Sequence, residues 1–248
     1  MTPRERLLTV LRGDLPDCVP VAPDFSNMIP ARRTGKPFWD LYLYNDPPVW
    51  QAYIDCAKHF NIDSLMDGYF WLDYPGEAAD GPEWENFIVD RTPERLVTQR
   101  SYAERGKRIW EPSVAVYRVA DPPVRGIAPR RVGLPDVPVQ WEPVEGVRPD
   151  PHGPEDLKRC KARLGDQGLV GVGVIGTCVL GNEKAVYDYY DHPEKYERLA
   201  EERIGQGERR FNYIMSLDVK PDFVCVGGSG TLVFQTVDMF RELAFPAV

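Results

Sequence analysis

The sequence predicts an α/β fold in which helices cover both faces of a parallel β-sheet. Two predicted strands, residues 169–175 and 222–226, are apolar at nearly every position rather than at alternate positions. Helical patterns at residues 154–164, 182–190 and 192–217 alternate with these strands. Strands that are hydrophobic throughout and separated by helices are typical of parallel sheets that are buried on both sides.

Composition is that of a globular protein and excludes several classes. The chain has 248 residues, 43% of them hydrophobic, which is enough for one large domain or two small ones. No apolar stretch approaches the roughly 20 residues that cross a bilayer, and the opening residues do not form a secretory signal. The net charge of −8 argues against nucleic-acid binding, and five irregularly spaced cysteines indicate reduced thiols. We therefore expect a cytoplasmic protein with no nucleic-acid or membrane partner.

The first predicted elements are a helix and a short strand. Thr2 is suited to cap the helix with Glu5 three residues later, and Gly13 is suited to end it. Residues 18–22 are predicted to form a short buried strand, although Pro20 restricts this segment to a strand end or an edge.

A second helix and a second strand follow. Asp46 and Pro47 mark the helix start, and apolar residues then recur at helical spacing over residues 49–57. Residues 62–66 are predicted to form the next strand.

The pattern changes between residues 73 and 154, where proline is dense. Residues 95–104 and 107–116 are predicted to form two strands joined around Gly106, and residues 121–154 show little periodicity. A long irregular excursion of this kind is either a functional lid or interaction surface, or a floppy insertion.

The carboxyl-terminal part resumes the alternation and ends with a helix that Thr236 caps. In total we predict about four parallel strand–helix units, whereas a complete eight-unit barrel takes ~250 residues without insertions. The residues therefore predict either an open sheet of four or five strands or the front part of a longer barrel. Residues 244–248 carry no polar tail, which we interpret as a break in the middle of a fold.

Short motifs in both halves of the chain occur in the order and spacing of a known superfamily. These motifs are the opening segments 2–8, 11–14 and 19–21, the strand entry 60–63, and the glycine-containing strand end 228–232 with the capped helix 236–246. Through them the whole chain resembles the uroporphyrinogen decarboxylase superfamily. The resemblance implies an incomplete (β/α)8 TIM-type barrel with about four parallel strand–helix units and a long β-hairpin-containing insertion. It would form one domain over residues 1–248, truncated at the carboxyl terminus, with residues 73–154 inserted.

The resemblance implies an enzyme that acts on a tetrapyrrole or a corrinoid-linked substrate. The superfamily contains decarboxylases and methyltransferases, and the decarboxylases carry a Met-Arg-Gln-Ala-Gly-Arg stretch that residues 25–33 lack. We therefore expect methyl transfer between a corrinoid protein and a thiol or pterin acceptor, with this chain by itself inactive. Uroporphyrinogen decarboxylation in porphyrin metabolism and a non-catalytic module that docks a corrinoid protein are the alternatives.

The candidate site residues follow from the same resemblance and from strand ends. The decarboxylases place an aspartate just after the second strand. At that position this sequence has Phe70, with Asp67 before it and Asp73 after it. The arginine pair Arg32 and Arg33 can bind a carboxylate or a phosphate through paired hydrogen bonds. The glycine-rich turn at residues 227–230 either exposes backbone amides to an anion or is simply a tight turn. The expected catalytic residues are Asp67, Tyr69 and Asp73, and the expected substrate-binding residues are Asp24, Arg32, Arg33, Gly228 and Ser229.

We expect no metal or cofactor within this chain. The methyltransferases of the superfamily bind zinc through a His-x-Cys pair and a later cysteine, and no His-x-Cys occurs here. In the superfamily this motif follows the helix that ends in proline, so it would lie beyond Val248. Zinc is therefore expected only in a longer, complete protein.

Overall fold

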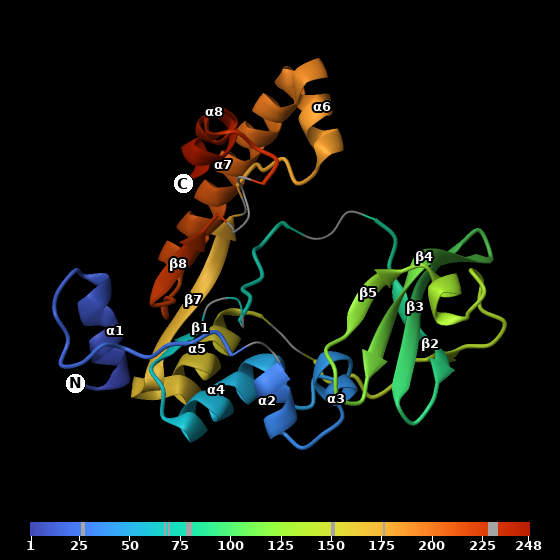
Figure 1. Cartoon of the computed structure of the whole chain (residues 1–248), viewed down its shortest axis with the longest axis horizontal. Helices are drawn as coiled ribbons and strands as arrows, with labels where there is room; N and C mark the ends of the chain where they lie inside the picture. The colour runs from blue at the N-terminus through green and yellow to red at the C-terminus, as the bar shows by residue number, and fades with distance from the viewer. Residues whose placement is uncertain are drawn as a thin grey trace. The chain divides into compact units, whose positions relative to one another are not determined.

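The computed structural model describes residues 1–25, 28–66, 68, 70–77, 81–149, 152–175, 177–227 and 233–248. Contacts divide the chain into two compact units, each of which contains one β-sheet (Figure 1). The parallel-sheet unit comprises Met1–Pro20, Ser64–Glu77 and His152–Val248, and the antiparallel-sheet unit comprises Val21–Asp63 and Ala78–Pro151. The fold is thus a mixed α/β fold, and neither sheet closes on itself. Among the described helices, none is both long and apolar enough to cross a membrane.

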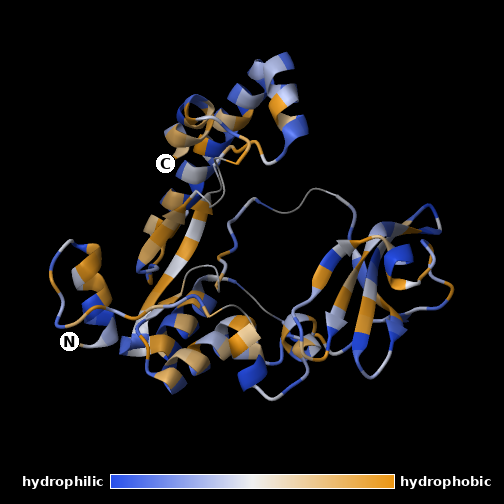
Figure 2. Ribbon diagram, in the orientation of Figure 1, coloured by the Kyte–Doolittle hydropathy of each residue, from blue (hydrophilic) through white to orange (hydrophobic). Residues whose placement is uncertain are grey.

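The parallel-sheet unit contains three strands whose spatial order follows the chain. These are β1 (Ser64–Met66), β7 (Gly168–Ile175) and β8 (Phe223–Val226), in the order β1-β7-β8 and parallel throughout. The apolar strands predicted at residues 169–175 and 222–226 are therefore confirmed. Figure 2 shows β7 as hydrophobic along its length, and Leu169, Val170 and Val172 are fully buried.

Two glycines of β7 let the neighbouring strands approach closely. A Cβ atom on Gly168 would lie 1.8 Å from the carbonyl oxygen of Ser64, and one on Gly171 would lie 2.2 Å from the ring of Phe223. Because atoms at these distances would overlap, only glycine fits at both positions.

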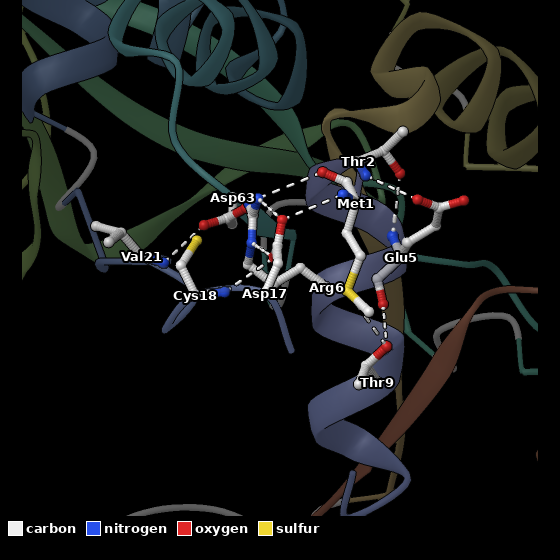
Figure 3. Close-up of polar contacts among 9 residues, drawn as sticks. All are labelled: Met1, Thr2, Glu5, Arg6, Thr9, Asp17, Cys18, Val21 and Asp63. Atoms are coloured by element: carbon white, nitrogen blue, oxygen red, sulfur yellow. Dashed lines mark hydrogen bonds and ion pairs between the residues drawn. The ribbon is translucent and has the colours of Figure 1, made fainter. Parts of the chain in front are cut away.

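Helices flank these strands along the chain. They are α1 (Pro3–Leu11), α5 (Pro154–Leu164), α6 (Glu183–Asp191), α7 (Pro193–Ser216) and α8 (Val237–Met239), which continues into a π-turn, Phe240–Ala244, and a 3-10 turn, Phe245–Ala247. The predicted cap of the first helix is confirmed: Glu5 N–H donates to Thr2 Oγ1 at 3.2 Å, and Thr2 N–H donates to Glu5 Oε2 at 2.8 Å (Figure 3). Thr236 likewise caps α8, as predicted.

The antiparallel-sheet unit contains three helices and a five-stranded sheet. The helices are α2 (Met28–Arg33), α3 (Phe38–Tyr42) and α4 (Val49–Phe60). The strands are β2 (Glu85–Arg91), β3 (Arg95–Glu104), β4 (Lys107–Arg118), β5 (Val124–Ile127) and β6 (Glu142–Pro143), in the order β5-β4-β3-β2-β6. All five strands lie within residues 73–154, and the predicted hairpin around Gly106 is confirmed as β3 and β4.

The two faces of the antiparallel sheet differ. One face carries a fully apolar cluster of Val89, Val97, Val114 and Val116, against which Val132 and Leu134 pack. On the other face, Leu96 and Tyr117 pack with Leu43 and with aromatic residues of α3 and the turn after it. Beyond this second cluster the same face carries polar side chains, because Thr98 and Arg100 follow Leu96 at alternate positions of β3.

The strand predicted at residues 18–22 is wrong. The segment is extended but forms no ladder, and Val19 and Val21 are 82% and 58% exposed. Val21 N–H donates to the Asp63 carboxylate at 2.7 Å, and Asp63 N–H donates to the Val21 carbonyl at 3.0 Å (Figure 3). Pro20 has no N–H to give to a ladder, so pairing is confined to this one point next to the start of β1.

The Asp222 carboxylate ties together four elements of the parallel-sheet unit. It accepts hydrogen bonds from Arg4 of α1 at 2.5 Å, from Lys161 of α5 at 2.7 Å and from the Val170 N–H of β7 at 2.9 Å, and Asp222 itself directly precedes β8. Burial raises the pKa of this carboxyl group, but the hydrogen bonds from Arg4, Lys161 and Val170 outweigh burial and hold the pKa below its usual range. The ionised form is therefore the one that stabilises the fold.

We expect Asp222→Asn to lower the free energy of unfolding by about 2–3 kcal/mol at pH 7, because two partly buried cations lose their counter-charge. The folded-state pKa is depressed, so this stabilisation is present above the unfolded pKa of about 3.9 and is lost as the pH falls through the lower folded value. Urea denaturation at pH 7 and at decreasing pH measures the effect. The difference between wild type and variant should shrink below about pH 4.

Asp17→Asn is the matched control, because Asp17 also pairs with an arginine and a second cation but is 41% exposed. It should change stability far less than Asp222→Asn. Equal effects of the two substitutions, or a difference that persists in acid, would contradict the role of the buried carboxylate.

Candidate functional site

The carboxyl ends of the parallel strands are the first place to look for a site, because parallel α/β proteins place their ligands there. After β1, residues 70–77 run along this end of the parallel-sheet unit. Phe70 is 1% exposed, and the edge of its ring meets His152 at a centroid distance of 5.8 Å. Asp73 N–H donates to the His152 carbonyl at 2.9 Å. This segment is therefore anchored at its start by both packing and a backbone hydrogen bond.

A charged cluster anchors the far end of the same segment. Arg210 of α7 binds Glu77 with two nitrogens at 2.6–3.0 Å, and its third nitrogen donates to the Val174 carbonyl at 2.8 Å. Val174 lies where the pairing of β7 with β8 is irregular, so its carbonyl is available to a side chain. The hydrogen bonds from Arg210 hold the pKa of the Glu77 carboxyl group below its usual range, although burial opposes them.

Tyr74 completes this Glu77–Arg210 cluster. Its hydroxyl donates to the Gly173 carbonyl at 2.8 Å, and the Arg210 guanidinium lies 4.8 Å from the centre of its ring. Burial raises the pKa of Tyr74 to about 12, so the hydroxyl is protonated near neutral pH. The Glu77 carboxylate and the Arg210 guanidinium pair with each other, so we interpret this cluster as structural: it holds residues 70–77 in place.

The structure places Asp73 on this anchored segment with an exposed side chain. Among the described residues, its carboxylate has no hydrogen-bond or ion-pair partner. Its backbone is fixed by the bond to His152 on one side and by the hydroxyl of Tyr74 on the other. A carboxylate held in this way is suited to accept N–H groups or to neutralise a cation.

Gln235 and Cys178 are two of the buried residues of this unit that carry polar side-chain groups. Gln235, just before α8, is 3% exposed, and neither atom of its amide has a hydrogen-bond partner among the described residues. Cys178 follows β7 and lies in an apolar cluster with Leu180 and Leu243. Burial raises the pKa of the Cys178 thiol, and the charge of Arg203 offsets this only in part, so the thiol is not activated as a nucleophile.

The substrate-binding residues expected near the amino terminus belong to the antiparallel-sheet unit. Asp24, Arg32 and Arg33 are all exposed, and the two arginines lie in the last turn of α2. In the described part of the chain, neither guanidinium has a hydrogen-bond or ion-pair partner. Burial raises the pKa of the Cys56 thiol, and the nearby charge of Arg33 lowers it in part. The arginine pair thus keeps its donors available for an anion.

Four expected site residues, Asp67, Tyr69, Gly228 and Ser229, lie outside the described residues. Phe70, at the position that the resemblance gives to the decarboxylase aspartate, is buried and packs against His152. Within the described ranges, no three His, Cys, Asp or Glu side chains gather as a metal site.

Sequence reasoning missed the Glu77–Arg210 cluster and Gln235. Glu77 and Arg210 are 133 residues apart, so no local spacing could pair them. The sequence offered only a general signal for this cluster. Tyr74 and Glu77 follow the end of a strand, which is where parallel α/β proteins place functional groups.

Comparisons of the chain with protein-family models, with curated proteins and with solved structures find no match. Fold and site together define an α/β protein with a parallel sheet, an anchored carboxylate at its carboxyl end and an open arginine pair in a second unit.

We expect Arg210→Met to lower the free energy of unfolding by about 2–3 kcal/mol, since it leaves the Glu77 carboxylate and the Val174 carbonyl without donors. Amide hydrogen exchange in residues 70–77 should also speed up, because this cluster anchors the segment. Arg209→Met is the matched control, since Arg209 is exposed and adjacent in the sequence. If the two variants behave alike, the cluster is not an anchor.

Proposed function

We propose that this chain is part of an enzyme of the uroporphyrinogen decarboxylase superfamily that acts on a tetrapyrrole or a corrinoid-linked substrate. We propose further that the reaction is methyl transfer between a corrinoid protein and a thiol or pterin acceptor. The observation that carries the proposal is the order β1-β7-β8, in which each parallel strand lies beside the next one along the chain. Strand order reverses at the switch point of a doubly wound sheet, whereas it stays consecutive in a barrel.

The finer part of the fold proposal is an incomplete (β/α)8 barrel with about four strand–helix units. The free edge of β8 supports it, because no described strand pairs with that edge.

Two sets of residues are assigned roles in this proposal. In the parallel-sheet unit, Asp73 on its anchored segment is the candidate that accepts N–H groups of a ligand. In the antiparallel-sheet unit, taken by itself, Arg32 and Arg33 are the candidates that pair with an anionic group such as propionate or phosphate. The described residues do not fit the zinc site that the methyltransferases of the superfamily carry. No step of the reaction is therefore assigned to zinc in this chain, which we expect to bind substrate without turning it over.

One observation favours a second candidate, a non-catalytic module that docks a corrinoid protein. Val137, Val139 and Trp141 are 63%, 87% and 48% exposed within four residues of each other, inside the region predicted as an insertion. Exposed apolar residues that gather in this way are typical of protein interaction surfaces.

We expect the chain to bind hydroxocobalamin, and the double substitution Arg32→Gln with Arg33→Gln to weaken that binding about tenfold or more, since each charge-assisted hydrogen bond is worth about 1.5–3 kcal/mol. Titration followed by absorbance measures the affinity. Arg118→Gln, which removes an exposed arginine of β4, is the control and should leave the affinity unchanged.

The same titration with uroporphyrin separates the candidates. Binding of uroporphyrin without hydroxocobalamin would favour the decarboxylase alternative, and capture of a corrinoid protein without binding of either free compound would favour the docking module. Failure of all three to bind would overturn the proposal.

A further inference from the structure

The antiparallel-sheet unit contains a cavity that the proposed function does not use. Its volume is about 450 Å³, within the range of roughly 300–1,000 Å³ that small-molecule sites occupy. It lies over the polar half of one sheet face and extends to the turn after α3. The residues that line it and carry the argument are Asn86, Thr98, Arg100, Glu111, Ser113 and Arg125.

The charges of this cavity do not cancel. Arg100 and Glu111 form a bidentate pair, with Nε to Oε2 at 2.9 Å and Nη2 to Oε1 at 2.6 Å. Arg125 of β5 is exposed and has no hydrogen-bond or ion-pair partner in the described part of the chain. Two guanidinium groups and one carboxylate therefore leave one positive charge uncompensated at the cavity.

Tyr42 also lines the cavity, but its Oη atom is buried and is therefore not one of the donors that face a ligand there.

The remaining lining is suited to hydroxyl groups. Thr98 and Ser113 contribute hydroxyls, and Asn86 adds a side-chain amide, all on one face of β2, β3 and β4. These groups both donate and accept, so they match a ligand with several hydroxyls rather than an apolar one.

We infer that this cavity binds a small hydroxylated monocarboxylate, with Arg125 pairing with the carboxylate. A carboxylate is favoured over a phosphate because it carries one charge, whereas a phosphate carries nearly two at pH 7 and would meet the negative charge of Glu111. This inference is independent of the tetrapyrrole proposal, since it uses none of its residues.

Isothermal titration calorimetry of the whole chain with gluconate, glucose and glucose 6-phosphate tests the inference. Gluconate should bind at least tenfold more tightly than glucose, and more tightly than glucose 6-phosphate. Arg125→Gln should weaken gluconate binding about tenfold or more, because it removes a charge-assisted hydrogen bond. Arg118→Gln, an exposed arginine of the same sheet that does not line the cavity, should bind gluconate as the wild type does.

The inference is overturned if gluconate gives no binding, if glucose or glucose 6-phosphate binds at least as tightly, or if Arg125→Gln binds gluconate like the wild type.

Discussion

The parallel sheet of this protein depends on one buried carboxylate. Asp222 lies at the amino end of β8 and accepts hydrogen bonds from α1, α5 and β7 at once. A carboxylate with 5% of its side chain exposed would be costly without such donors. The hydrogen bonds to this carboxylate bring Arg4 and Lys161 to the sheet from distant parts of the sequence. The contacts of Asp222 therefore stabilise the amino end of the sheet, whereas parallel α/β proteins bind ligands at the carboxyl end.

At the carboxyl end, the chain uses side chains where a longer neighbouring strand would have supplied backbone donors. β1 has only three residues, so it pairs with β7 only as far as Val170. Farther along β7, the hydroxyl of Tyr74 and the guanidinium of Arg210 donate to the carbonyls of Gly173 and Val174. These bonds anchor residues 70–77 and place an unpaired carboxylate, that of Asp73, on a fixed backbone. This arrangement supports binding of a ligand that offers N–H groups.

Much of the fold was predictable because its signals are local. The capping box of Thr2 and Glu5, the apolar run of β7 and the hairpin around Gly106 each lie within a few residues of sequence. The segment at residues 18–22 was misjudged because its apolar residues suggested burial, whereas Pro20 limits its pairing and leaves Val19 exposed.

The site was less predictable, because its contacts join distant parts of the chain. The sequence points to Asp73 by its place after a strand, and the structure shows that a hydrogen bond to the His152 carbonyl fixes its backbone. Glu77 and Arg210, and likewise Arg100 and Arg125, are brought together only by the fold. The uncompensated charge of the cavity in the antiparallel-sheet unit has no sequence signature, since arginine is common on sheets.

The claim at the centre of this account is that a tetrapyrrole or corrinoid ligand binds at the carboxyl ends of β1 and β7. Amide hydrogen exchange of the chain with and without hydroxocobalamin tests it directly. The account predicts slower exchange on binding in residues 70–77 and 177–181, with the amino-terminal ends of β7 and β8 unchanged. Slower exchange that is confined to the antiparallel-sheet unit, or no change in residues 70–77, would contradict it.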